Sequence, residues 1–114
     1  MDIPQSVDNL PWRPHPIAKG VKIKPLITRE DTGSDVTCML VQVPAGVNVP
    51  EHIHDDQADI IYPLEGKGRM WIQGQAPFDL VPGIIVHVPA GTPHKIEDVE
   101  ETLLVYDVFQ PALF

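Results

Sequence analysis

Short apolar segments rich in β-branched residues alternate along the chain with clusters of glycine, proline and small polar residues. The breaks between the apolar segments include REDTGSD, PAG, EGKG, GQAP and PAGTP, which are typical turn sequences. Short strands at this spacing, with no long helical segment between most of them, predict an all-β sandwich or barrel. The predicted strands cover residues 21–28, 35–43, 59–64, 68–74, 78–81, 84–88 and 102–109.

The segment 94–110 has two interpretations. It contains neither proline nor glycine, and helical spacing joins four of its residues, Ile96, Val99, Leu103 and Tyr106. Its second half, TLLVYDVF, is rich in β-forming residues. We therefore predict a strand over 102–109.

Residues 1–19 differ from the rest of the chain because they contain four prolines, at positions 4, 11, 14 and 16. Proline fixes its own backbone and disfavours helix at the residue before it. We predict an extended arm over 1–19, which wraps the domain or a neighbouring subunit, and a barrel domain over 20–114. His15 lies between two of the prolines and is interpreted as an exposed loop histidine.

Composition narrows the classes of partner. A chain of 114 residues is expected to form one domain with one core. Its net charge of −8 repels phosphate backbones and anionic membranes, so neither nucleic acid nor a membrane is expected as a partner. No apolar run reaches the length of a signal peptide or a membrane span. The lone Cys38, interpreted as a buried apolar residue, fits a reducing compartment, and we expect a cytoplasmic protein.

The candidate chemistry begins at His52-Ile53-His54. Successive side chains of a strand alternate between faces, so two histidines at this spacing point the same way. They can share a metal ion, although such a pair is more often solvated or hydrogen-bonded. The neighbouring acidic residues Glu51, Asp55 and Asp56 are interpreted as solvated, because adjacent residues of a strand face opposite ways.

Two linked motifs surround this histidine pair. The first is G-x5-H-x-H-x4-D-x6-G, from Gly46 to Gly66, and the second is G-x5-P-x-G-x2-H-x3-D, from Gly83 to Asp98. Sixteen residues, 67–82, separate them. Together the motifs resemble the two-part signature of the cupin family, with the short spacer of small single-domain bacterial cupins.

The resemblance implies a jelly-roll barrel. It also implies that a divalent transition metal is bound by four side chains in the mouth of the barrel, those of His52, His54, Asp59 and His94. Asp59 stands where the family has glutamate, and its side chain is one methylene shorter. Three alternatives follow for Asp59: it coordinates the metal directly, it does so through a water, or it does not coordinate the metal. Asp98 stands where the family has asparagine, in a predicted turn, and this difference is interpreted as structurally minor.

Three neutral imidazoles and a carboxylate suit Fe(II), Mn(II), Ni(II), Cu(II) or Zn(II). In a six-coordinate centre, four protein ligands leave two positions for water, substrate or dioxygen. The alternative is a barrel without metal, in which the three histidines hydrogen-bond to one another and to water.

Two function hypotheses follow, because cupins include dioxygenases, decarboxylases, isomerases and sugar-binding proteins. The first is a metal-dependent enzyme, dioxygenase-like or isomerase-like, whose small organic substrate chelates the metal. The second is a non-catalytic cupin that binds a sugar or another metabolite. We also expect a homodimer, paired through the proline-rich arm and the edge strands.

Several further side chains are candidates for the pocket. His87 is the one additional candidate for a general base, and its alternative is a half-buried strand histidine. Four more residues on predicted strands either shape a pocket or belong to the core, namely Tyr62, Arg69, Trp71 and Tyr106.

Overall fold

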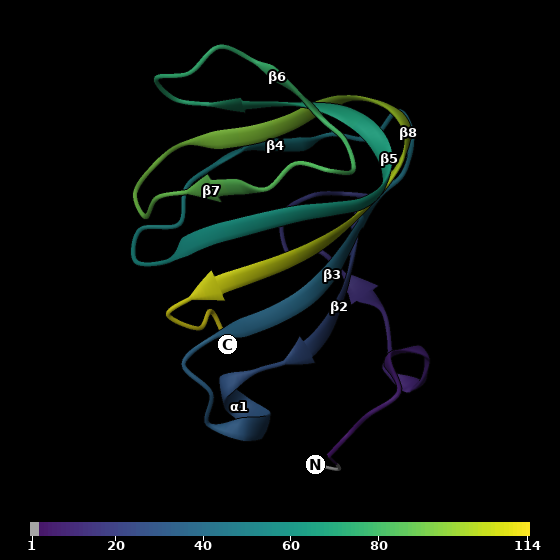
Figure 1. Ribbon diagram of the computed structural model, residues 1–114, viewed down its shortest axis with the longest axis vertical. Helices are drawn as coiled ribbons and strands as arrows, with labels where there is room; N and C mark the ends of the chain where they lie inside the picture. The colour runs from purple at the N-terminus through teal and green to yellow at the C-terminus, as the bar shows by residue number, and fades with distance from the viewer. Residues whose placement is uncertain (1–2) are drawn as a thin grey trace.

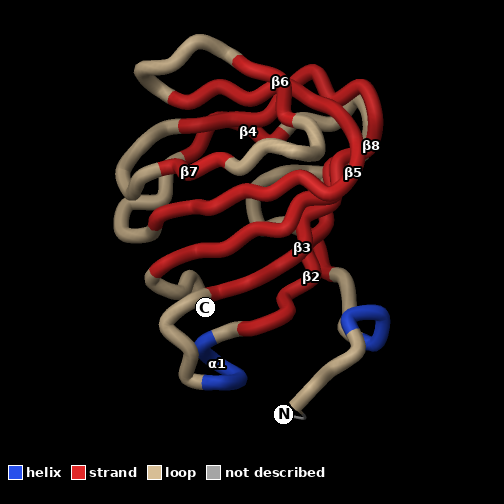
Figure 2. The backbone as a smooth tube through the Cα atoms, viewed as in Figure 1, coloured by secondary structure: helices blue, strands red, loops and turns tan. Residues whose placement is uncertain are grey.

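The computed structural model describes residues 3–114 and, over this range, is built almost entirely of strands. Helix is confined to two short segments of the described residues, which Figure 2 draws in blue. The elements in chain order are η1 (Val7–Asn9), β1 (Arg13–Pro14), β2 (Lys22–Ile27), α1 (Arg29–Thr32), β3 (Thr37–Val43), β4 (Val49–His52), β5 (Ala58–Ile72), β6 (Phe78–Leu80), β7 (Val86–Val88) and β8 (His94–Gln110). No helix in this range is long and apolar enough to span a membrane.

The eight strands form one antiparallel sheet that folds over on itself. Its order is β1-β2-β3-β8-β5-β6, while β4 pairs with β8 and β7 pairs with β5. Figure 1 shows β5 and β8 bending together at one side of the molecule, so that each contributes to both halves of the barrel. The predicted all-β barrel is confirmed.

The bend in β5 replaces a predicted turn. The sequence EGKG was expected to separate strands over 59–64 and 68–74, but β5 runs through it with register shifts between Pro63 and Arg69. Gly66 has φ of +92°, which favours glycine, and a Cβ atom there would overlap the backbone of Thr102 on β8. The turn prediction was wrong because glycines can bend a strand without ending it.

A similar local change explains the helical spacing in 94–110, where the helical alternative is wrong. Ile96 and Val99 are both buried although they are three residues apart. Between them Asp98 has φ of +51°, and this left-handed backbone shifts the alternation of side chains along β8. Asp98 therefore lies within a strand and not in the predicted turn. Aspartate is one of the few residue types that adopt this conformation readily.

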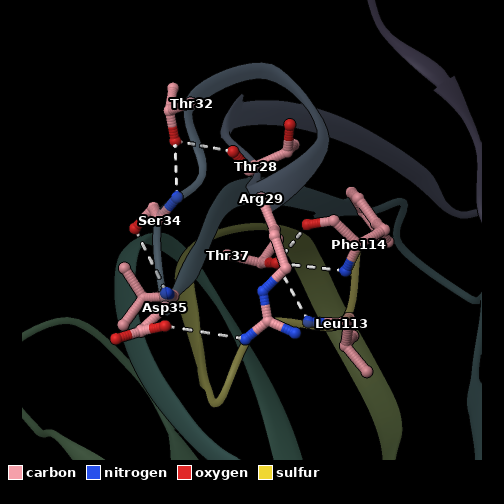
Figure 3. A network of polar contacts seen from close by, with 9 residues as sticks. Thr28, Arg29, Thr32, Ser34, Asp35, Thr37, Leu113 and Phe114 are labelled. Carbon is pink, nitrogen blue, oxygen red and sulfur yellow. Dashed lines mark hydrogen bonds and ion pairs between the residues drawn. The ribbon is translucent and has the colours of Figure 1, made fainter.

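The C-terminal residues and α1 lie at the lower end of the sheet in Figure 1. Figure 3 shows the C-terminal residues held by Thr37, which is buried on β3. The Thr37 hydroxyl donates to the Phe114 carbonyl at 2.9 Å and accepts from the Leu113 amide at 3.0 Å. The Phe114 carbonyl also accepts from the Arg29 amide at the start of α1, at 2.8 Å. This network holds the last residues against the end of the sheet.

The N-terminal arm packs against its own barrel over the part that the structure describes, and its residues 1–2 lie outside the described range. β1 pairs with β2, and Ala18 is buried. The buried Lys24 donates from Nζ to the Val7 carbonyl at 3.0 Å, and the same nitrogen lies 5.0 Å from the ring centroid of Trp12. Cys38 is buried on β3, as expected.

Gly66→Ala is expected to reduce the free energy of unfolding by roughly 3 kcal/mol or more, because strain at positive φ adds to the overlap with Thr102. Gly74→Ala is the matched control, since Gly74 also has a positive φ but has open space around it. It should reduce the free energy of unfolding by only about 1 kcal/mol. Urea unfolding measures both, and equal losses would contradict the close approach of β5 to β8.

Candidate metal centre

His52, His54 and His94 come together inside the barrel. His52 and His94 are directly opposite each other in the pairing of β4 with β8. His54 lies two residues beyond the end of β4, where its carbonyl accepts from the Gly91 amide at 2.8 Å. One ligand atom from each ring lies within 4.8 Å of the others. The three side chains could therefore hold one metal ion.

Backbone contacts orient two of the three rings. His52 Nδ1 lies 2.8 Å from the Pro50 carbonyl oxygen, and His94 Nδ1 lies 2.9 Å from the Thr92 carbonyl oxygen. A carbonyl only accepts hydrogen bonds, so each Nδ1 carries the proton and donates it. Nε2 of both rings is left with a free lone pair, which is the arrangement of metal-binding histidines.

The electrostatics favour neutral rings. Burial lowers the pKa of both His52 and His54, because a charged imidazolium loses its hydration inside the protein. The carboxylate of Asp59 opposes this effect at both rings but does not reverse it. Neutral imidazole is the form that binds metals, so these rings need not lose a proton at pH 7.

Asp59 lies beside the histidines despite its short side chain. It is buried on β5, with Oδ2 at 3.5 Å from His94 Nε2 and 3.9 Å from His54 Nε2. Three buried side-chain atoms lack a hydrogen-bond partner among the described residues, namely Asp59 Oδ1, His94 Nε2 and Asp107 Oδ1. The structure therefore brings all four sequence-predicted ligands together. Direct coordination by Asp59 remains a prediction.

A second buried carboxyl group, Asp107 on β8, is in contact with Asp59 and was not identified from the sequence. Burial raises the pKa of Asp107, and the negative charge of Asp59 raises it further. Burial alone would raise the pKa of Asp59 as well, but the neighbouring Asp107 carboxyl and the His94 and His54 imidazoles lower it. The raised pKa of Asp107 and the lowered pKa of Asp59 favour a proton on Asp107 and a charge on Asp59. The sequence did carry a signal, because Asp107 interrupts the inward-facing apolar series 103, 105, 107 and 109.

These polar groups face a cavity of about 380 Å³ whose walls are mostly apolar. Its size lies within the usual range for small-molecule sites. Side chains from several strands and from the C-terminal segment form the apolar wall, among them Ile23, Met39, Val41, Ile61, Phe109 and Phe114.

His15 also lines this cavity. Its interpretation as an exposed loop histidine was wrong, because the ring is half-buried and the segment that carries it folds against the barrel. The sequence pattern could not place His15 in the cavity, because the prolines on either side of it are equally compatible with an arm exposed to solvent.

Other sequence candidates lie outside the cavity. His87 is exposed on β7 and borders a separate surface groove, so it cannot serve as a general base at the metal site. Tyr62 and Arg69 are exposed, and Arg69 pairs with Asp79 at 3.0 Å. Neither Trp71 nor Tyr106 lines the cavity. The acidic residues expected to be solvated are exposed, namely Glu51, Asp55 and Asp56.

Comparison with protein families matches residues 39–109 to the cupin domain. The chain belongs to the cupin family. The matched region contains the three histidines and both buried aspartates, so the candidate centre lies within the part of the chain that defines the family. His15 lies outside it.

Among cupins, the chain is 35% identical to quercetin 2,3-dioxygenase of Bacillus subtilis over 71 residues, which are 62% of this chain and 21% of that enzyme. It is 31% identical to the uncharacterized protein MJ1618 of Methanocaldococcus jannaschii over 90 residues, covering 68% of this chain and 71% of that protein. A crystal structure of a predicted oxalate decarboxylase of Thermotoga maritima superposes with a TM-score of 0.80 at 20% identity, covering 93% and 96% of the two chains. At that identity the likeness concerns the fold.

The proton on Asp107 predicts a distinct pH dependence in the metal-free protein. The raised pKa of Asp107 means that the native state keeps a proton which the unfolded chain releases above the usual value of 3.8. The contribution of Asp107 to the free energy of unfolding should therefore fall as pH rises above about 4, by up to about 1.4 kcal/mol per pH unit, until pH passes the native pKa.

Asp107→Asn keeps the shape of the side chain and a donor toward Asp59 but has no proton to lose. Urea unfolding of both metal-free proteins between about pH 4.5 and 7.5 measures the difference. Wild type should lose stability relative to Asp107→Asn across this window. Parallel profiles would show that Asp107 is ionised in the native protein.

Proposed function

We propose that the chain is a metal-dependent cupin enzyme, dioxygenase-like or isomerase-like, whose small organic substrate chelates the metal. His52, His54 and His94 would bind the metal through Nε2, and Asp59 would supply a carboxylate oxygen. The observation that carries this proposal is the cluster of three imidazoles beside Asp59, in which His94 Nε2 is buried without a hydrogen-bond partner and lies 3.5 Å from Asp59 Oδ2.

Buried polar atoms without partners are costly, commonly by about 1–3 kcal/mol each. No hydrogen bond joins the three imidazoles directly among the described residues, so the alternative of a self-contained histidine network gains no support. A metal ion would give His94 Nε2 the partner that it lacks. When bound, a transition metal would supply a Lewis acid or an oxygen-activating centre.

The ligand set limits the metal. Three imidazole nitrogens and one carboxylate oxygen suit Fe(II), Mn(II), Ni(II), Cu(II) or Zn(II). Cys38 does not line the cavity, so the set contains no thiolate of the kind common in structural zinc sites. This favours a centre that also accepts an exogenous ligand.

The cavity supports a small substrate with an apolar body and adjacent oxygen atoms. Its volume of about 380 Å³ and its apolar walls would exclude water from the body of such a molecule. The similarity to a quercetin dioxygenase supports the same class of ligand. With His87 outside the cavity, the site favours reaction of a metal-coordinated substrate over catalysis by a separate general base.

The homodimer and the cytoplasmic location belong to the same proposal. Apolar side chains remain exposed on the N-terminal arm, with Ile3 at 94% and Ile17 at 58% exposure. A second subunit would cover such side chains.

The first test is the metal content of protein purified without an affinity tag and reconstituted with each of the candidate metals. Wild type should bind about one ion, and His54→Ala should bind it at least roughly a hundredfold more weakly. Asp59→Asn, which keeps the shape but not the charge, should also weaken binding if Asp59 is a ligand. His87→Ala is the control, because His87 lies outside the cavity and should not affect metal content. Wild type without metal would contradict the proposal.

The second test separates an enzyme from a cupin that only binds a metabolite. Metal-loaded protein is mixed with quercetin in air, and quercetin absorbance and dissolved oxygen are followed together. A dioxygenase-like enzyme consumes one dioxygen for each quercetin, and His54→Ala does not. Binding of quercetin without oxygen uptake or product would instead favour the non-catalytic alternative for this ligand.

A further inference from the structure

The N-terminal arm brings a fourth histidine, His15, to the cavity that contains the three candidate ligands. His15 follows β1 directly, and its amide donates to the Val21 carbonyl at 2.9 Å. The Val21 amide in turn donates to the Ala18 carbonyl at 3.1 Å. The loop that carries His15 is thus fixed to the start of β2.

The loop also fixes the tautomer of His15. The backbone amides of Ile17 and Ala18 both donate to Nδ1, at 3.1 and 3.0 Å. An imidazole nitrogen that accepts hydrogen bonds carries no proton. In the neutral ring the proton must therefore be on Nε2, which makes Nε2 a donor.

This arrangement is the reverse of the one at two of the candidate metal ligands. His52 and His94 use Nδ1 as a donor to carbonyl groups, which leaves Nε2 as a lone pair. His15 uses Nδ1 as an acceptor, so its distal nitrogen cannot bind a metal without losing its proton. The two amides that donate to Nδ1 favour the neutral ring, and burial acts in the same direction because it lowers the pKa of His15.

We propose that His15 is a substrate-binding residue that donates a hydrogen bond from Nε2 to an oxygen atom of a ligand held at the metal centre. The inference rests on the proposed function and extends it. It assigns to the arm a direct role in ligand recognition, outside the region that matches the cupin domain.

The donor also defines the ligand class more narrowly. A neutral N–H favours an acceptor oxygen, such as a phenolate, enolate, carboxylate or carbonyl oxygen, and does not favour a cationic group. Apolar side chains that line the same cavity, among them Ile17 and Phe114, favour a ligand with an apolar or aromatic body behind that oxygen. An aromatic vicinal diol meets both conditions.

The test uses Zn(II)-loaded protein and 4-nitrocatechol, whose absorbance changes when its oxygens bind a metal. The decisive variant is His15→Asn, because an asparagine side-chain oxygen can accept the same two backbone amides in an Asx-type turn but offers no distal ring donor. His87→Asn is the matched control on an exposed histidine outside the cavity. Zinc content is measured for each protein, and the Kd for the probe is measured by titration.

We expect His15→Asn to keep its zinc and to bind the probe roughly ten- to a hundredfold more weakly, with His87→Asn unchanged. In wild type, a long-range proton–nitrogen NMR spectrum should show the proton of His15 on Nε2, and its resonance should shift when the probe binds. This readout does not depend on the folding of any variant.

Two results would overturn the role of His15 alone. One is zinc-loaded His15→Asn that binds the probe within about twofold of wild type, and the other is loss of zinc from His15→Asn, which would make His15 a support of the metal. Wild type that binds no zinc, or that binds the probe equally with and without it, would overturn the proposed function and this inference together.

Discussion

The bend shared by β5 and β8 is the constraint on which the candidate site depends. β8 begins at His94, opposite His52 on β4, and passes Asp107 near its other end. A straight strand of this length would hold these two residues far apart. Because β5 and β8 bend together, as Figure 1 shows, side chains from both halves of the sheet line one cavity. The bend in turn requires residues that tolerate unusual backbone, Gly66 and Asp98.

The same geometry concentrates polar groups where the barrel is otherwise apolar. Two carboxyl groups and four imidazoles, including that of His15, lie within a wall of isoleucine, valine, methionine and phenylalanine side chains. Such a cluster would be unfavourable without partners, and the protein reduces the cost in two ways. The raised pKa of Asp107 favours its neutral form and so disfavours a second buried charge, while the carbonyls of Pro50 and Thr92 orient two of the rings. His94 Nε2 remains without a hydrogen-bond partner and is available to a metal.

Much of this could be read from the sequence, because strand alternation and turn residues are local signals. The spacing of the histidines and of Asp59 likewise identified residues that the fold brings together. The continuity of β5 could not be predicted, since it depends on the close approach of Gly66 to Thr102 from a distant strand. The helical spacing in 94–110 was misleading because the left-handed backbone of Asp98 changes which face of the strand the following side chains occupy. The orientation of His15 depends on which ring nitrogen meets the backbone amides, and no sequence pattern carries that information.

The central claim is that the three imidazoles and Asp59 bind one metal through the atoms left free by the protein. Anomalous diffraction from crystals of metal-loaded protein, collected on both sides of the absorption edge of the metal, tests it most directly. The account predicts a single strong peak bonded to Nε2 of His52, His54 and His94, with an Asp59 oxygen among its ligands. A peak bonded to Nδ1 atoms, a peak at another site, or an ordered cluster without a peak would contradict it.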